Sequence, residues 1–387
     1  MKEVVIIDAA RTPVGKYKGS LRGLSAAQLG TVVTKGLLNR VAVSADQIDQ
    51  VIFGNVLQGG SGQNVARQVA IESGIPETVP AMTVNEVCGS GLKALVLARQ
   101  LIQLGEAEVV LAGGTESMSQ APLVKPYDPE TNDYGEPISS MICDGLTDAF
   151  SKTHMGLTVE KLAETYEISR DAQDRFSLAS HQKAAKAVKA GKFDKEMISV
   201  TENGEVLLAK DEGIRENSTL EKLGALKTVF LPEGSITAGN ASTLNDGASA
   251  ILLASKDYAE AHQLPYLAVI RDYAEIGTAP ADMGISPIFA IRKLLAKTGV
   301  EAEQIDLFEI NEAFAASSLI VEQELGLEKE RVNIYGGGVS LGHPIGASGA
   351  RIITTLVHAL IQEDKKLGVA SLCIGGGLGL AMLIERT

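Results

Sequence analysis

The chain has 387 residues, of which 45% are hydrophobic and 21% are charged. This length accommodates two or three domains with a large buried core, and the composition is that of an ordinary globular protein. The net charge of −13 argues against a surface that binds nucleic acid or anionic membranes, but it does not exclude a phosphorylated ligand held by a local basic patch.

The first predicted elements lead to one of the three cysteines. Residues 1–8 favour a first strand rather than a signal peptide, because their apolar run is short and ends in an acidic residue. Residues 82–87 favour a short strand, and residues 92–104 favour a largely buried helix that stops at Gly105. Cys88 therefore lies where a strand leads into a helix.

Cys88 has two interpretations on this segment alone. The unpaired N–H groups and the macrodipole at a helix N-terminus favour a thiolate, which would make Cys88 a nucleophile at neutral pH. Free cysteine is also among the most buried residue types, so a structural role in the core is the alternative.

Turn-forming and charged sequence fills the middle of the chain. Its one strong helix begins after Ser169, a suitable N-cap, and ends before Gly191. Strand character returns at residues 248–254. We therefore expect an α/β protein in which a loop domain interrupts the first of two halves, with the domains at residues 1–118 plus 244–270, 119–243 and 271–387.

A second glycine-rich region surrounds His343. Pro344 suits the first turn of a helix, and an apolar helical pattern runs from there to about Leu360. Residues 368–383 favour a strand, a glycine turn and a second strand, with Cys373 at the end of the first strand. A histidine and two cysteines in glycine-rich turns are what covalent acyl transfer with a general base requires.

The two glycine-rich regions also correspond in order and spacing. The segment 48–54 is echoed by 305–311, Cys88 corresponds to His343, and a Gly113-Gly114 turn corresponds to Gly375-Gly376, all at nearly the same offset. Such a correspondence predicts two copies of one α/β unit whose strand-to-helix turns converge across a pseudo-twofold axis. Chance similarity among glycine-rich turns is the alternative.

Several motifs in fixed order, spread over essentially the whole chain, make the sequence resemble the thiolase family, and within it the short-chain members. They are Asp8–Gly15, Asn85–Gly91, Gly113–Met118, His154–Gly156, Thr237–Ser242, Asn245–Gly247, Asn311–Phe314, Gly342–Gly349 and Cys373–Gly377. The resemblance implies a duplicated five-layered αβαβα fold with two mixed sheets and an inserted loop domain.

The resemblance also implies catalytic roles. Cys88 would accept the acyl group, His343 would take its proton, and Cys373 would be the acid/base at the α-carbon of the second acyl-CoA. Asn311 would position a water that stabilises the enolate oxygen together with His343. The backbone N–H groups of Cys88 and Gly375 would face the oxyanion of the acyl group. Cys143 matches no motif, and we assign it no role.

The substrate-binding residues implied by the resemblance come largely from the insertion. Arg215 would bind the nucleotide end of coenzyme A, although a solvated surface charge is the alternative for it. Met155, Phe230 and Met283 would wall the acyl pocket, although Met and Phe also commonly fill cores. The implied substrate contacts are Leu146, His154, Met155, Arg215, Phe230, Ala238, Ser242 and Met283.

The expected activity is the condensation of two acetyl-CoA molecules to acetoacetyl-CoA and CoA, and its reversal. The alternatives are a broader-chain 3-ketoacyl-CoA thiolase and a non-catalytic acyl-CoA-binding relative. The latter would typically have lost Cys88, His343 or Cys373. A ketoacyl-carrier-protein synthase would lack the Asn311 motif, and no nucleotide-binding glycine pattern is present.

The remaining expectations concern surroundings and assembly. The three cysteines have neither metal-ligand nor disulfide spacing, so we expect no metal and a reducing compartment, the cytoplasm. The resemblance implies no cofactor, because coenzyme A thioesters are the substrates. No run approaches the ~20 apolar residues of a transmembrane helix. The family implies a homodimer or a homotetramer, and residues 123–141 do not resemble the basic tetramerisation loop of the biosynthetic members.

Overall fold

A computed structural model describes residues 2–387. Its centre is a ten-stranded mixed sheet in the order β14-β15-β16-β13-β1-β12-β5-β3-β4, with the short β2 beside β12. The strands of this sheet are β1 (Val4–Arg11), β2 (Gly15–Lys16), β3 (Gln50–Gly54), β4 (Ala81–Val84), β5 (Val109–Ser117), β12 (Asn245–Ser255), β13 (Ala268–Gly277), β14 (Leu307–Ile310), β15 (Leu367–Ile374) and β16 (Leu378–Arg386).

The two halves of this sheet repeat one pairing pattern, which confirms the predicted duplication. In the first half, β3 runs parallel to β5, while β12 pairs antiparallel with both β5 and β1. In the second half, β14 runs parallel to β15, while β16 pairs antiparallel with both β15 and β13. Strand β4 extends the first half by pairing parallel to β3.

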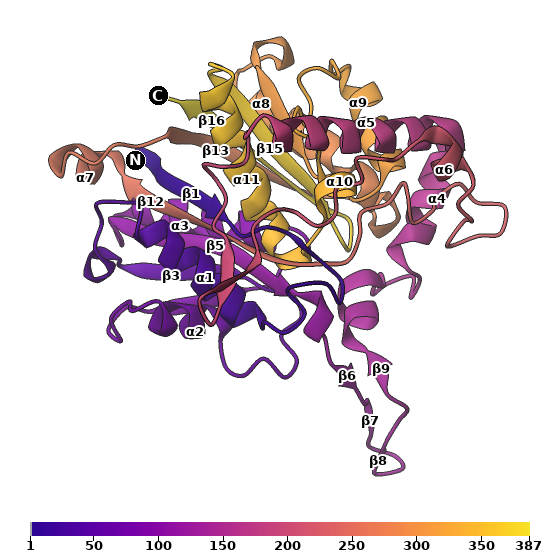
Figure 1. The fold of residues 1–387 in the computed structure, drawn as a ribbon, viewed down its shortest axis with the longest axis horizontal. Coiled ribbons are helices and arrows are strands. Elements are labelled where there is room, and N and C mark those ends of the chain that lie inside the picture. Colours follow the sequence, from indigo (N-terminus) through magenta and orange to yellow (C-terminus); the bar gives the residue numbers. More distant parts are fainter. Residues whose placement is uncertain (1) are drawn as a thin grey trace.

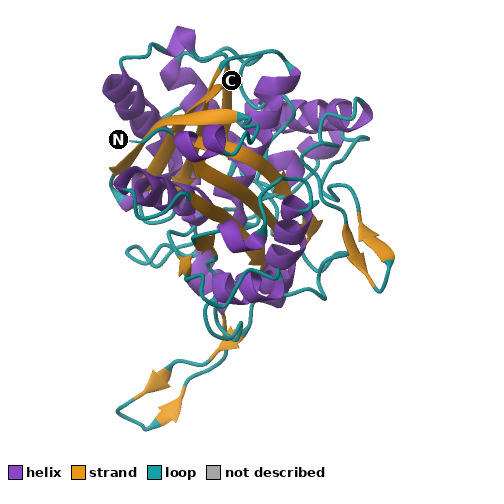
Figure 2. Ribbon diagram, turned by 90° about the vertical axis from the view of Figure 1, so that its left-hand side faces the viewer, coloured by secondary structure: helices purple, strands orange, loops and turns teal. Residues whose placement is uncertain are grey.

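Helices complete the five layers that the resemblance implies (Figures 1 and 2). Helices α3 (Ser90–Leu104) and α11 (Ile345–Gln362) pack against each other between the two halves of the sheet. Helices α1 (Ala26–Leu38) and α2 (Val65–Glu72) cover the outer face of the first half. Helices α8 (Ser286–Thr298) and α9 (Ala315–Leu325) cover that of the second half.

The expectation of two separate mixed sheets needs one correction. Strands β1 and β13 pair at Val5↔Val269 and Ile6↔Ala268, so hydrogen bonds run continuously through all ten strands. These strands are the inner edges of their halves, and the contact satisfies backbone groups that would otherwise be unpaired. Hydrophobic patterns fix which face of a strand is buried, but they do not reveal which edges meet.

The central helices carry most of the shared core. Every residue of α11 from Ile345 to Leu360 is buried, because sheet strands and α3 surround the helix. Among the helices of residues 2–387, none combines the length and apolarity needed to cross a bilayer.

The predicted local elements need small corrections around the glycine-rich turns. The strand before Cys88 ends at Val84 rather than residue 87, and α3 begins at Ser90 and ends at Gly105 with φ of 80°. Gly113 and Gly114 lie inside β5 and not in a turn. The predicted helix after Ser169 is confirmed as α5 (Arg170–Lys189), with the Ser169 hydroxyl accepting from the N–H of Ala172 at 3.2 Å.

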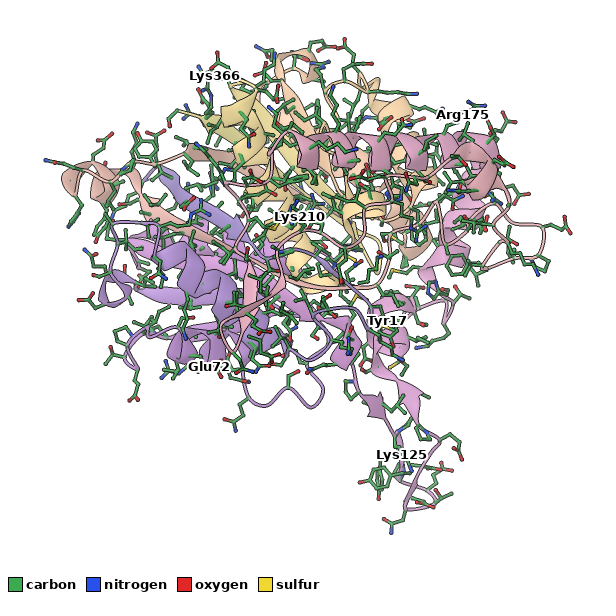
Figure 3. The ribbon with its side chains drawn as sticks, in the orientation of Figure 1. Tyr17, Glu72, Lys125, Arg175, Lys210 and Lys366 are labelled. Carbon is green, nitrogen blue, oxygen red and sulfur yellow. The ribbon has the colours of Figure 1, made fainter. Side chains whose placement is uncertain are left out.

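The region between β5 and β12 supplies an arm and several helices. The arm is a pair of short two-stranded ladders, and it projects from the body of the molecule with Lys125 on it (Figures 1 and 3). Its strands are β6 (Leu123–Val124), β7 (Tyr127–Asp128), β8 (Asp133–Tyr134) and β9 (Ile138–Ser139). After the arm come a π-helical turn (Met141–Leu146), α4 (Met155–Thr165), α5, β10 (Val200–Glu202), β11 (Glu205–Leu208) and α6 (Leu220–Gly224). Elsewhere lie α7 (Lys256–Ala261) and α10 (Gly338–Leu341).

Candidate active site

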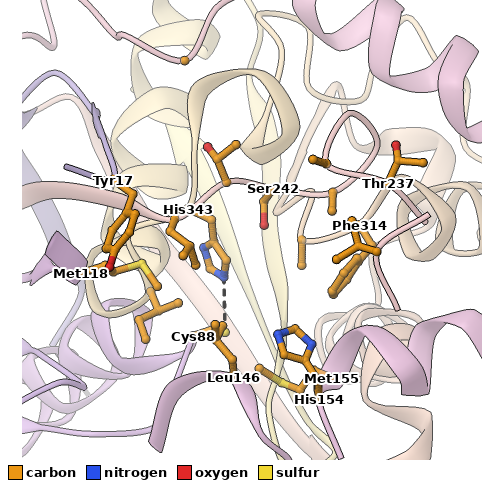
Figure 4. A pocket seen from close by; sticks show the side chains of 18 of the residues that line it. Tyr17, Cys88, Met118, Leu146, His154, Met155, Thr237, Ser242, Phe314 and His343 are labelled. Atoms are coloured by element: carbon orange, nitrogen blue, oxygen red, sulfur yellow. Dashed lines mark hydrogen bonds between the residues drawn. The ribbon is translucent and has the colours of Figure 1, made fainter. Parts of the chain in front are cut away.

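A cavity of about 520 Å³ lies where the N-terminal ends of α3 and α11 meet the insertion (Figure 4). It contains Cys88, His343 and Cys373, which come from three distant parts of the sequence. The insertion closes the other side through α4 and the loop around Ser242. The structure therefore brings the predicted nucleophile and both predicted acid/base groups to one space.

Cys88 is held by a tight, strained turn. Val87 has φ of 48°, a left-handed conformation that is a clear outlier for a β-branched residue. The Ser90 hydroxyl accepts from the N–H of Glu86 at 2.9 Å and donates to the carbonyl of Val87 at 2.6 Å. The Asn85 side chain accepts from the N–H of Val87 at 3.0 Å. These bonds fix the direction in which Cys88 leaves the backbone.

His343 faces Cys88 because the two central helices approach each other backbone to backbone. The His343 Nε2 lies 3.3 Å from the Cys88 Sγ (Figure 4). A Cβ atom on Gly91 would lie 2.8 Å from the N of Ala350, so only glycine allows this approach without movement of the helices. The backbone N–H of His343 donates to the Asn245 side chain at 2.9 Å, which anchors its loop to β12.

Burial decides the protonation of this pair. Desolvation raises the pKa of Cys88 to about 11, although the N–H groups of Gly375 and of Cys88 itself lower it. Desolvation, with the nearby Arg351, lowers the pKa of His343 to about 4. Burial therefore opposes the expected thiolate in the unliganded site, because loss of hydration favours a neutral thiol and a neutral imidazole.

Cys373 and Asn311 lie on the second half of the sheet. Cys373 is near the C-terminal end of β15 and buried, and desolvation, together with Cys88, raises its pKa to about 12. Asn311 follows β14, and its Nδ2 lies 3.4 Å from the His343 Nδ1. The Asn311 Oδ1 is buried and has no protein hydrogen-bond partner, so it is free to hold a water.

All eight residues assigned to substrate binding lie on the cavity wall. His154 stacks against Phe230 with ring centroids 4.6 Å apart, and burial lowers the pKa of His154. Met155 lies close to the turn after Cys373, since a Cβ on Gly375 would come 3.1 Å from its sulfur. The wall residues named from the sequence are Leu146, His154, Met155, Arg215, Phe230, Ala238, Ser242 and Met283.

The other two predicted residues, Gly375 and Asn311, do not line the cavity, but they lie next to Cys88 and His343. Gly375 reaches Cys88 through its backbone N–H, and Asn311 reaches it through His343. Their predicted roles, and those of the wall residues, stay predictions.

Glu116 is a buried polar residue that the sequence did not single out. Its carboxylate accepts from the N–H groups of Val56, Leu57 and Gly346 and from the Asn55 side chain, at 2.8 to 3.2 Å. It thereby ties the loop after β3 to the first turn of α11. It lies in the motif Gly113–Met118, but its partners are too distant in sequence for a local pattern to reveal them.

Basic side chains lie at the outer end of the cavity. Lys16 and Arg215 line this end, and a second cavity of about 570 Å³ shares Arg215 and adds Lys222. The backbone N–H of Arg215 donates to the His181 ring at 3.2 Å, which holds the loop. The acidic chain thus carries a local basic patch beside its site.

Family models identify this combination of fold and site. The model of the thiolase N-terminal domain matches residues 4–257, and that of the thiolase C-terminal domain matches residues 264–386. The chain belongs to the thiolase family.

Individual relatives are similar over their whole length. An acetyl-CoA acetyltransferase of Pseudomonas aeruginosa is 52% identical over 392 residues, covering 100% of both chains. The solved human mitochondrial 3-ketoacyl-CoA thiolase superposes with a TM-score of 0.96 at 41% identity, covering 100% of this chain and 99% of that one. The Acat5 thiolase of Ascaris suum, solved in complex with coenzyme A, gives a TM-score of 0.94 at 42% identity, covering 100% of both chains.

Proposed function

We propose that this thiolase is an acetyl-CoA C-acetyltransferase, which condenses two acetyl-CoA molecules to acetoacetyl-CoA and CoA and also catalyses the reverse thiolysis. The observation that carries the proposal is that one cavity holds two buried thiols, Cys88 and Cys373, with His343 within hydrogen-bond distance of the first. One thiol can hold the acyl group while the other acts on the second substrate. The similarity to the Pseudomonas aeruginosa acetyl-CoA acetyltransferase supports the same reaction.

The first half-reaction transfers the acetyl group to Cys88. As the sulfur attacks the thioester carbonyl, its proton passes to the His343 Nε2, and the departing CoA sulfur takes that proton. We expect the backbone N–H groups of Cys88 and Gly375, which lower the pKa of Cys88, to stabilise the oxyanion.

The second half-reaction uses Cys373. The Cys373 thiol passes its proton to the His343 Nε2, and the thiolate so formed removes a proton from the α-carbon of the second acetyl-CoA. A water held by Asn311, together with the Nε2–H of the protonated His343, stabilises the enolate oxygen. The enolate then attacks the acetyl group on Cys88, and the Cys88 sulfur leaves with the C–S electrons and takes the proton from Nε2. The thioesters supply the activated acyl group, so the proposed reaction needs no additional cofactor. In reverse, acetoacetyl-CoA and CoA return two acetyl-CoA.

The two adjoining cavities offer a path for coenzyme A, since both are lined by Arg215. We expect its thioester end to reach Cys88, its pantetheine arm to pass Leu146 and Ser242, and its phosphates to approach Arg215 and Lys222. These cations explain how a chain of net charge −13 binds an anionic substrate.

Supplying acetyl-CoA alone tests the proposed chemistry. We expect peptide mass spectra to show one acetyl group on the peptide that carries Cys88. The variant Cys373→Ala should still be acetylated but should form no acetoacetyl-CoA. Acetylation confined to Cys373 or Cys143, or condensation at the normal rate by Cys373→Ala, would overturn the assignment.

The second candidate is a 3-ketoacyl-CoA thiolase that accepts longer chains, the activity named for the human mitochondrial enzyme. The TM-score of 0.96 does not separate the two candidates, because the Bacillus anthracis acetyl-CoA acetyltransferase gives the same value. Met155, Phe230 and Met283 narrow the acyl end of the cavity, which supports a preference for acetyl and acetoacetyl groups. We expect poor thiolysis of ketoacyl chains of about eight carbons or more, since overpacking typically costs ~1–3 kcal/mol. Equal kcat/KM for acetoacetyl-CoA and 3-ketodecanoyl-CoA would establish the second candidate instead.

We further propose that the enzyme forms a homodimer or homotetramer in the cytoplasm. The outer edge of β4 is free within the described chain, and the arm exposes Leu123, Tyr127, Tyr134 and Ile138. Both features are suited to contact with a second copy. The need for two free thiols supports a reducing compartment. Sedimentation velocity measures the assembly, and a monomer at micromolar concentration would contradict it.

A further inference from the structure

Ser348 lies on the side of His343 that faces away from Cys88. It is buried in the first turn of α11, with 1% of its surface exposed. The Ser348 Oγ lies 2.5 Å from the His343 Nδ1 and 2.9 Å from the carbonyl oxygen of Pro344. Nothing in the motif Gly342–Gly349 marks this serine from the sequence alone as a partner of the histidine.

The Ser348 hydroxyl has one hydrogen and faces two acceptors, the carbonyl oxygen of Pro344 and an unprotonated Nδ1 of His343. The structure assigns this hydrogen to the Pro344 oxygen, which can only accept. With its hydrogen placed there, the Ser348 oxygen accepts from the His343 Nδ1–H. A neutral imidazole has one proton, so Nε2 carries a lone pair and accepts from the Cys88 thiol.

Within the described residues, Asn311 makes the one competing polar contact with the His343 Nδ1, and this contact is the weaker of the two. Its Nδ2 is 3.4 Å away, near the limit for a hydrogen bond, whereas Ser348 is at 2.5 Å. The Asn311 Oδ1 is buried without a partner, so turning the amide by 180° would present an acceptor to the same Nδ1–H. Only the turned amide offers the Nδ1–H a second acceptor, and the observed Nδ2 is too distant to outweigh the contact with Ser348.

We propose that Ser348 is a positioning residue that holds His343 as the Nδ1–H tautomer, so that Nε2 is free to take the proton of Cys88. The proposal rests on the proposed function for its kinetic consequences but not for its structural content. In the step concerned, the S–H bond of Cys88 breaks and an N–H bond forms at Nε2. The sulfur electron pair forms the new C–S bond, and the CoA sulfur leaves with the C–S electrons and takes the proton from Nε2.

Ser348 gives the His343 Nδ1 a neutral hydrogen-bond acceptor, whereas a carboxylate in the same position would give it a negatively charged one. After proton transfer, the imidazolium donates through Nδ1–H to Ser348, which is polarised in turn by the Pro344 carbonyl. These two hydrogen bonds orient the charged imidazolium ring but place no full negative charge beside it. They therefore leave the buried pair neutral at rest, in keeping with the lowered pKa of His343.

The first test reads the tautomer directly. The chain has five histidines, so ¹⁵N-histidine labelling and two-bond ¹H–¹⁵N correlation give a resolvable spectrum, with His343→Asn identifying the signals of His343. Between pH 6 and 8 we expect protonated Nδ1 and unprotonated Nε2 in the wild type. A wild-type spectrum with the proton on Nε2 would refute the proposal, whether or not the protein has thiolase activity.

The second test removes the hydroxyl. In Ser348→Ala we expect a mixed or inverted tautomer and a fall of roughly 10²-fold or more in the rate of Cys88 acetylation, with little change in KM. Ser348→Cys, with a weak acceptor at the same place, should recover part of the rate. Ser317→Ala is the matched control, because Ser317 is buried in α9 and its hydroxyl has no partner.

The outcomes separate the two proposals. If the wild type shows the Nδ1–H tautomer but is not acetylated by acetyl-CoA, the proposed function fails and the role of Ser348 in fixing the tautomer stands. If Ser348→Ala is folded and keeps both the tautomer and the acetylation rate, the role of Ser348 fails and the function stands.

Discussion

At the scale of single residues, the site works with groups whose charge is suppressed. Cys88, Cys373 and His343 are buried. Burial raises the pKa of both thiols and lowers the pKa of the imidazole, so all three groups favour their neutral forms. A neutral thiol reacts more slowly with electrophiles than a thiolate does, so the resting Cys88 is less open to side reactions.

The pH dependence of alkylation follows from these shifts. Because burial raises the pKa of Cys88 to about 11, its thiolate fraction should rise by about tenfold per pH unit from pH 7 to 10. His343, with its pKa lowered to about 4, stays neutral throughout this range. Iodoacetamide rates at Cys88, measured in a Cys143→Ala background without acyl-CoA, should show this rise. A plateau reached near pH 7 would mean that the helix N-terminus prevails over burial.

Met155 sets the expected limit on the acyl chain. Met155→Ala should raise kcat/KM for 3-ketohexanoyl-CoA relative to acetoacetyl-CoA by about tenfold or more, the usual effect of room for one or two methylenes. Met141→Ala is the matched control, since both methionines are 8% exposed but Met141 lies outside the cavity wall. Equal selectivity of the two variants for 3-ketohexanoyl-CoA over acetoacetyl-CoA would show that Met155 does not limit the acyl chain.

At the scale of elements, the site depends on how α3 and α11 are held at their first turns. Glycines allow α3 and α11 to pack closely, but close packing does not by itself prevent one helix from sliding along the other. Glu116 fixes the position of α11, because one carboxylate bonds both the loop after β3 and the start of α11.

Replacing this carboxylate should affect stability and rate together. Glu116→Gln places an N–H₂ group against backbone donors and leaves at least one of them without an acceptor, which costs about 1–3 kcal/mol. We expect a lower urea midpoint and a reduced kcat, because His343 moves with α11. The control is Glu106→Gln, at an exposed position in the loop after α3, which should change neither the urea midpoint nor kcat. Unchanged unfolding of Glu116→Gln would show that the network is dispensable.

The strand–turn–helix around Cys88 was predictable because its signals are local: an apolar run, a glycine turn and a buried helix closed by Gly105. The wall residues were found through family motifs rather than through pattern. Ser348, the partner of the His343 Nδ1, is only five residues away, but the loop geometry that joins the two follows no periodic pattern. The pKa of Cys88 and the donors on Glu116 were not predictable either. Each depends on contacts between segments far apart in the chain, and no local periodicity records these.

At the scale of the whole molecule, the two halves share one core. Helix α11 is buried by strands of both halves, including β5, β12 and β15. A half without its partner would expose one entire face of this helix to water. Exposing apolar surface to water costs ~25 cal/mol per Å² in free energy, so the isolated half is destabilised.

We therefore expect the chain to unfold in a single transition. A fragment of residues 264–387 should lack a cooperative thermal transition by circular dichroism, while the whole chain should show one, with coincident calorimetric and van't Hoff enthalpies per cooperative unit. Two resolved transitions in the intact protein, or a folded fragment, would contradict a shared core.

The equivalence of Cys88 and His343 has a consequence for the history of the molecule. They lie 255 residues apart, before corresponding helices of the two repeats. A symmetric pair of identical halves would carry two nucleophiles or two bases at this point, never one of each. Joining both copies in one polypeptide frees each to mutate alone. The single pair of Cys88 and His343 thus requires two halves that differ in sequence, and one polypeptide that carries both copies meets that requirement.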